Sequence, residues 1–331
     1  MSTNTRSPKS TTHNSDTIPS KNDKSEQARK LCVERHSHIY FTKEELTENP
    51  SLRDNVPIRK EMKTRVHCCN FIVHSGKLLG FPQRTLSTAQ LLYHRFYLFY
   101  SLNDFSPMTV SIACLFVACK IEETFKKLSD ILAATYEVAH PGKHMSLDSP
   151  EVEEKRKRII SYERLIIETL CFDFRVQHPF KYIIKFVKKL NGDKKLAQKA
   201  WNITVESYKT QLGLQYPPHI IAAGAIHLAV LLSRGKFTIP RTVDGKPWYK
   251  ALSCHLSDVE DVCCQLLDFY ISQADPKDDK LTEYTRVKIE LNERAKKRPH
   301  LEGHHNGEEP TRRKLDISST VDTSTVRYFF N

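Results

Sequence analysis

The stretch TVSIACLFVACKIEE, residues 109–123, decides the fold of this 331-residue chain. It is apolar on nearly every helical face up to Cys119 and then changes abruptly to the charged sequence KIEE. A short helix that is apolar all round belongs at the centre of a helical bundle. It is too short to span a membrane, which needs about 20 apolar residues. The charged residues at its end therefore lie where the core meets the surface, a natural place for a rigid recognition site.

Helical spacing continues on both sides of this run. Apolar residues recur every three or four positions, which predicts amphipathic helices before and after the central one. Thr85 is expected to cap the helix that precedes the run, and Ser149 with Pro150 is expected to begin the last helix of this half. These patterns predict four helices around the central one, approximately at residues 59–76, 85–99, 128–136 and 149–170.

The second half of the chain repeats this organisation. PPHIIAAGAIHLAVLL, residues 217–232, is again apolar almost all round and lies about 110 residues after the first run. Further helical patterns are expected at residues 180–190, 195–210, 248–252 and 257–272. A period of this size indicates a duplicated domain. Because no long alternation of polar and apolar residues is present, the sequence predicts an all-α fold of two tandem five-helix domains.

The ends of the chain differ from its middle. Residues 1–38 and 275–331 are polar and charged, with little apolar periodicity, so we expect a disordered N-terminal tail and a mostly disordered C-terminal tail. The two domains are expected at 39–175, including an N-terminal extension, and at 176–274. Within the second tail, apolar residues spaced two apart allow a short docking helix: Val287, Ile289 and Leu291.

Composition limits the chemistry of the chain. The net charge of +12 is compatible with acidic partners, but no arginine–aromatic reading motif accompanies it, so nucleic-acid binding by the core is disfavoured. The nine cysteines include no C-x-x-C pair, and without a signal peptide they are expected to be reduced packing residues in an intracellular protein. A zinc site around His67, Cys68 and Cys69, or around His36 and His38, is the disfavoured alternative, because adjacent ligands on a helix point in different directions.

No catalytic constellation is found in the chain. It has no paired-carboxylate, Ser-His-Asp, phosphate-loop or metal-ligand pattern, so we expect no enzyme activity and no cofactor or metal. His94 lies among large aromatic residues and is expected to be buried or bridging rather than a general base.

Three segments resemble the cyclin family, and specifically the transcription-type cyclins, the group that includes cyclin K, cyclin T and the beta subunit of fungal carboxy-terminal-domain kinase I. TLSTAQLLYHRFYLF (85–99) contains the H-R-F-Y signature of their second helix. ACLFVACKIEETFKKLSDI (113–131) resembles their third and fourth helices, and ERLIIETLCFDFRVQHPFKYI (163–183) resembles the crossing into the second cyclin box. The resemblance covers residues 40–272 and implies two tandem cyclin boxes.

The resemblance also implies a kinase-contacting site. Lys120 and Glu163 match the pair that hydrogen-bonds the backbone of the C-helix of a cyclin-dependent kinase. Ile121 and Phe172 match apolar positions that pack on that helix. Glu123 is expected to support the site locally, and Phe125 to lie at its edge.

By resemblance, the chain is a regulatory subunit that activates a kinase of the RNA polymerase II C-terminal domain, promotes transcription elongation and is nuclear. The resemblance leaves open which kinase is the partner and whether a third subunit takes part. The alternative from another class is a cyclin-fold general transcription factor that binds promoter DNA. That alternative predicts an N-terminal zinc ribbon, which needs several cysteine ligands, whereas residues 1–38 contain a single cysteine, Cys32. An interaction scaffold without a kinase is the third interpretation.

Overall fold

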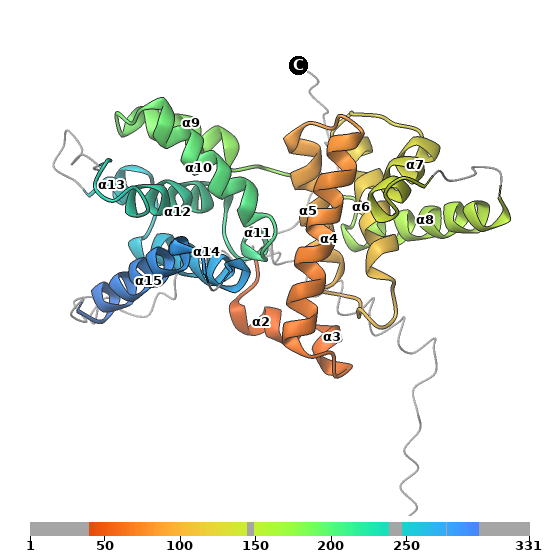
Figure 1. The fold of residues 1–331 in the computed structure, drawn as a ribbon, viewed down its shortest axis with the longest axis horizontal. Helices are drawn as coiled ribbons and strands as arrows, with labels where there is room; N and C mark the ends of the chain where they lie inside the picture. The colour runs from red at the N-terminus through yellow and green to blue at the C-terminus, as the bar shows by residue number, and fades with distance from the viewer. Residues whose placement is uncertain (1–39, 144–148, 238–246, 276, 298–331) are drawn as a thin grey trace, which may run out of the picture. The chain divides into compact units, whose positions relative to one another are not determined.

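The computed structural model describes residues 40–143, 149–237, 247–275 and 277–297. In these ranges the regular secondary structure is entirely helical, without strands (Figure 1). The expected tail at 1–38 lies outside the described residues, as does the end of the chain from residue 298. The all-α fold with two tandem domains is confirmed.

The first domain surrounds α6 (Pro107–Ile121). Val110, Ala113, Cys114 and Leu115 of this helix are completely buried, in agreement with its apolar sequence. The other four helices of this domain are α4 (Ile58–Leu78), α5 (Gln83–Phe96), α7 (Leu128–Ala139) and α8 (Pro150–Thr169). Gly76 of α4 faces Leu86 and Leu115, so the absence of a side chain there lets α4 approach the centre closely.

The second domain surrounds α12 (Pro218–Leu231) in the same way. Ala222, Ala225 and Ile226 are completely buried, and a Cβ added at Gly224 would lie 2.5 Å from Val262 Cγ1. Five more helices complete it: α9 (Phe180–Lys189), α10 (Lys194–Ser207), α11 (Leu212–Gln215), α13 (Trp248–Ala251) and α14 (Leu256–Gln273). The two apolar runs in the sequence are thus two separate core helices.

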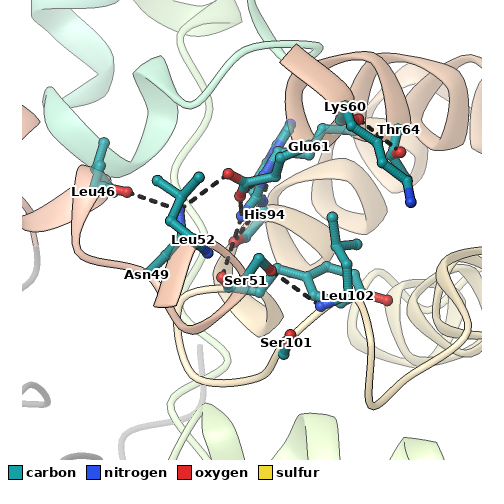
Figure 2. A network of polar contacts seen from close by, with 12 residues as sticks. Leu46, Asn49, Ser51, Leu52, Lys60, Glu61, Thr64, His94, Ser101 and Leu102 are labelled. Atoms are coloured by element: carbon teal, nitrogen blue, oxygen red, sulfur yellow. Dashed lines mark hydrogen bonds and ion pairs between the residues drawn. The ribbon is translucent and has the colours of Figure 1, made fainter. Parts of the chain in front are cut away.

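Short helices precede the first domain, α2 (Lys43–Thr47) and α3 (Pro50–Arg53). Thr42 and Glu45 form a capping box at the start of α2, so both orphan amides there are satisfied. The Asn49 amide, the cap of α3, donates to Leu46 O at 3.0 Å and to Glu61 Oε2 of α4 at 3.2 Å (Figure 2). A hydrogen-bonded joint therefore fixes this extension to α4.

The segment after residue 274 contains a long helix, although most of this tail was expected to be disordered. α15 (Asp279–Lys297) packs on α14 through Val287 and Leu291, which are buried in the core of the second domain. Ile289, the third residue of the proposed docking pattern, is 54% exposed. Two apolar residues four positions apart form one helical stripe, and Ile289 lies outside it.

The expected cap of the second helix was wrong. α5 begins at Gln83 with Pro82 as its N-cap, so Thr85 lies inside the helix and its hydroxyl is 3.0 Å from that of Thr124. Proline fixes a φ that is compatible with the helix start, which moves the start upstream.

The cysteines are unpaired wherever the structure describes them, and most are buried, as expected for packing residues; Cys171 is exposed. Among the described residues, no group of three or more His, Cys, Asp or Glu side chains has the arrangement of a metal site. None of the described helices has the length and apolar character needed to cross a membrane.

Candidate functional site

The last turn of α6 and the middle of α8 bring together Lys120 and Glu163. The Lys120 ammonium lies 2.6 Å from Glu163 Oε1 and 4.1 Å from the centre of the Phe116 ring. The Lys120 side chain is 44% exposed and that of Glu163 is 14% exposed. The pair is therefore held in place from one side and open to solvent on the other.

α6 ends in a tight turn that directs the residues after it outward. Thr124 N–H donates to Cys119 O at 2.9 Å and Glu123 N–H donates to Lys120 O at 3.3 Å. This is the hydrogen-bond pattern of a Schellman motif. Its left-handed position is usually glycine but here is Glu123, with φ of 56°. A non-glycine residue in this conformation requires support from its surroundings.

α8 ends in the same pattern. Phe172 N–H donates to Ile167 O and Cys171 N–H donates to Glu168 O, and both Cys171 and Phe172 have positive φ, at 45° and 59°. The turn leaves the Phe172 side chain 68% exposed, in edge contact with Phe174. Both helices that carry the Lys120–Glu163 pair thus end in turns built from non-glycine residues.

The other predicted site residues lie close to this pair in the sequence. Ile121 is half-buried and packs against the first-domain core, while Glu123 is exposed. Phe125 is 71% exposed, the largest exposure among the large apolar residues that the structure describes as exposed. An exposed phenylalanine therefore follows the end of each of the two helices, Phe125 after α6 and Phe172 after α8.

Glu122 is a member of this region that sequence reasoning did not single out. Its side chain is only 3% exposed, and it forms an ion pair with Arg84. Thr88 Oγ1 donates to Glu122 Oε1 at 2.6 Å, and His178 Nε2 lies 3.0 Å from the same Thr88 hydroxyl. His178 Nδ1 lies 2.6 Å from the Tyr208 hydroxyl.

Counting the available protons shows which group donates in each of these hydrogen bonds. Because the single Thr88 hydroxyl proton goes to Glu122, His178 must donate to Thr88 from Nε2. A neutral His178 then accepts from the Tyr208 hydroxyl at Nδ1. Burial lowers the pKa of His178, with Glu122 opposing, and favours this neutral form. In the sequence, His178 could have been noticed because it precedes Pro179 in the segment that leads into the second domain. Its hydrogen-bond partners, however, are set by tertiary packing.

His94 is buried and bridging, as expected. Its Nε2 lies 3.0 Å from Tyr208 O, and its carbonyl accepts from the Arg65 guanidinium. Burial, reinforced by the Arg65 charge, lowers the pKa of His94 to about 3. Arg65 itself is buried, and its guanidinium forms an ion pair with Glu61, with 2.7 Å between Arg65 Nη2 and Glu61 Oε1. This histidine is structural and is held neutral.

Comparisons with known proteins agree with these features. The family described as Cyclin, N-terminal domain matches residues 36–175, and the family described as Cyclin-T2-like, C-terminal domain matches residues 178–266.

Individual relatives give the same result. The chain is 39% identical over 242 residues to CTD kinase subunit beta of Schizosaccharomyces pombe, covering 72% of this chain and 68% of that protein. It is 37% identical to Cyclin-T1-4 of Arabidopsis thaliana over 70% of this chain and 43% of that protein. It is 33% identical to human Cyclin-K over 70% of this chain and 40% of that protein. The chain therefore spans less than half the length of the last two relatives.

A solved structure shares the fold. A chain of the yeast RNA Pol II CTD kinase CTDK-1 complex superimposes with a TM-score of 0.64 at 23% identity, covering 81% of this chain and 91% of that chain. A chain of the yeast TFIIK (Kin28/Ccl1/Tfb3) complex has a TM-score of 0.50 at 16% identity, over 70% and 96%. The two structures show the same fold, while the family-model matches and the 39% identical Schizosaccharomyces pombe relative show that the chain belongs to the cyclin family, whose members are regulatory and not catalytic subunits of kinase complexes.

Proposed function

We propose that this cyclin binds and activates a cyclin-dependent serine/threonine kinase that phosphorylates the RNA polymerase II C-terminal domain and thereby promotes transcription elongation in the nucleus. The observation that carries the proposal is the Lys120–Glu163 pair, which joins two helices that are each followed by an exposed phenylalanine. The names and sequence identity of the CTD kinase subunit beta and cyclin K relatives support the class of kinase.

The pair is better suited to binding than to stability. A partly exposed ion pair contributes about 0–1 kcal/mol to folding. The Lys120 ammonium has three N–H donors, of which one is used by Glu163, so the others remain for carbonyl groups of a partner helix. The remaining acceptor capacity of Glu163 suits amide N–H groups. A preformed pair also loses little side-chain entropy on binding.

The proposed partner surface extends beyond the pair. Ile121, Phe125 and Phe172 supply apolar area, and Glu123 supports the turn through its left-handed backbone. A ligand that binds one conformation of a kinase better shifts the kinase toward it. When the C-helix is held in its inward position, the kinase's own lysine and C-helix glutamate form the ion pair that phosphoryl transfer requires. We include a third subunit in the proposal as an additional component, in line with the three named components of the TFIIK complex.

Affinity purification of the tagged chain from its native cells, followed by mass spectrometry and a kinase assay, tests the proposal. We expect a co-purified cyclin-dependent kinase that phosphorylates a C-terminal-domain repeat peptide only when the chain is present. The chain purified alone should not turn over ATP. Recovery of promoter DNA without a kinase would support the general transcription factor instead, and recovery of neither would support a scaffold.

A further inference from the structure

Helix α9, the first of the second domain, has a solvent face made of lysines. Lys181, Lys185 and Lys188 are all exposed and lie four and three residues apart, so they share one face of the helix. Ile184, which is 50% exposed, lies between them on this face. The opposite face is buried in the domain core through Ile183, Phe186 and Val187.

This lysine face differs from the charged faces of α8 and α15 because it carries no acidic residue. In α8, Arg158 pairs with Glu154 and Arg164 pairs with Glu168. In α15, Glu290 pairs with basic residues on either side. Among the residues that the structure describes, no ion pair involves Lys181, Lys185 or Lys188.

Helix stability explains only part of the pattern. Lys188 and Lys189 in the last turn are favoured by the helix dipole, and Lys189 also donates to Ala251 O at 2.6 Å. Lys181 stands in the first turn, where a positive charge is disfavoured by the same dipole. A row of like charges that includes this position indicates a role in binding.

We propose that the α9 lysine face, defined by Lys181, Lys185 and Lys188, binds segments that already carry phosphoserines. The proposal rests on the proposed function, because the phosphorylated repeats are then the product of the complex itself. Three ammonium groups complement phosphate charges, and Ile184 offers an apolar contact to the residues between the phosphates. Retention of a phosphorylated segment would keep the neighbouring repeats close to the kinase.

The length of the face sets the phosphate spacing. Lys188 lies seven positions after Lys181 in the helix, which is about 10 Å along the axis. An extended peptide covers about 10 Å in three residues. Two phosphoserines three residues apart therefore match the two ends of the face. The face has no arginine and no exposed aromatic residue among positions 181–189, so it lacks the stacking groups that favour single-stranded RNA.

Fluorescence anisotropy of the full chain with a labelled repeat peptide tests the proposal directly. The probes are a peptide with two phosphoserines three residues apart, the same peptide without phosphate, and a short single-stranded RNA. The triple variant K181Q/K185Q/K188Q removes the face, since glutamine preserves helix propensity. The control K60Q/K63Q/K77Q removes three exposed lysines of α4 that are spread along the first domain.

We expect the doubly phosphorylated peptide to bind the α9 variant roughly tenfold more weakly than the parent chain, given the usual strength of exposed ion pairs. The control variant should bind like the parent. An equal loss of affinity in both variants would show that the peptide responds only to overall positive charge and not to the α9 lysine face, and would overturn the proposal. Absent phosphopeptide binding, or RNA binding that alone depends on the α9 lysines, would overturn it as well.

The kinase complex provides the second readout. Initial phosphorylation of the unphosphorylated peptide should be unchanged in both variants, while the number of phosphates added to a long repeat segment per encounter should fall only in the α9 variant. Phosphopeptide binding by a chain that activates no kinase would refute the proposed function but not this surface. An active complex with no difference between the variants in either assay would refute the surface alone.

Discussion

The C-terminal ends of α6 and α12, the two core helices, are equivalent in the fold and opposite in their chemistry. At the end of α12, Lys199 of α10 donates to Leu232 O at 2.8 Å and to the Ser233 hydroxyl at 3.1 Å. A lysine from within the same domain thus closes that end. At the end of α6 the lysine belongs to the helix itself and stays 44% exposed beside Glu163. The two domains therefore have similar cores and differ in the chemistry of this edge.

The buried centres of the two domains support this interpretation. Both core helices are apolar all round, and each is approached closely at one glycine, Gly76 in α4 of the first domain and Gly224 in α12 itself. The differences are at the ends and on the outer helices. The second domain also receives α15 on its α14 side through Val287 and Leu291, which extends its core. The first domain leaves the turns after α6 and α8 exposed.

The largest expected effect distinguishes the two helix ends. K120A/E163A should weaken kinase binding by about 2–5 kcal/mol, roughly 30-fold or more, because both charges become desolvated in the proposed interface. K199A should leave kinase affinity unchanged and affect only stability. Titration calorimetry with the purified kinase measures both. Equal affinity of K120A/E163A and the parent chain would remove this pair from the interface.

A buried threonine in each domain gives the next comparison. Thr88→Val removes the hydroxyl that bridges Glu122 and His178, whose own atoms Oε1 and Nε2 lie 3.6 Å apart, and weakening these buried hydrogen bonds should cost about 2–3 kcal/mol. Thr204→Val in α10 is the matched control, because the Thr204 hydroxyl has no partner among the described residues and should be replaced at little cost. Urea unfolding measures both free energies. A cost for Thr204→Val as large as for Thr88→Val would contradict the directed hydrogen-bond chain.

Acid should act on both domains through buried histidines. Burial lowers the pKa of His94 to about 3 and that of His227 to about 4, from an ordinary 6.5. Because folding lowers the pKa of each histidine, burial of its neutral form leaves the folded state fully stable above about pH 6.5. As the pH falls below this value, the histidines of the unfolded chain take up protons first, and the free energy of unfolding falls. Each histidine should remove about 2 kcal/mol between pH 7 and pH 5.

The variants His94→Gln and His227→Gln test this linkage by the change in pH dependence rather than by absolute stability. In each variant, the free energy of unfolding should fall by about 2 kcal/mol less between pH 7 and pH 5 than in the parent chain. A parent-like slope in His94→Gln would show that folding does not lower the pKa of this histidine.

The smallest expected effect concerns the two glycines. A Cβ at Gly224 would lie 2.5 Å from Val262 Cγ1 and 2.9 Å from Val262 Cβ, and the latter cannot rotate away. At Gly76 the close contact is the end of the Leu86 side chain, and the next atom is 3.5 Å away. Gly224→Ala should therefore be less stable than Gly76→Ala by about 1 kcal/mol. Thermal unfolding of the two variants would reveal the reverse order if Leu86 cannot adjust.

Sequence reasoning reached the parts of this molecule that are set by local patterns. The two apolar runs identified α6 and α12, and the family resemblance placed Lys120 opposite Glu163, where the structure holds them 2.6 Å apart. Thr85 was misplaced as a cap because Pro82 begins the helix earlier. α15 was underestimated because two buried residues, Val287 and Leu291, anchor an otherwise charged helix.

The connection from Glu122 to Tyr208 could not be derived from the sequence. Thr88, Glu122, His178 and Tyr208 are separated by up to 120 residues, and each has an ordinary local explanation as a helix, turn or core residue. Only tertiary packing brings their polar atoms within hydrogen-bonding distance. The Lys120–Glu163 pair could be predicted because a known family supplied the comparison, whereas the hydrogen-bond chain from Glu122 to Tyr208 had no such source.

Hydrogen exchange of the full chain with and without its kinase tests the central claim most directly, because it reports on both helix ends in one experiment. We predict slowed exchange at residues 119–126 and 163–174, around the Lys120–Glu163 pair, and unchanged exchange at the closed end of α12, residues 228–236. Protection at 228–236 with none at 119–126 would contradict the account and place the kinase on the second domain.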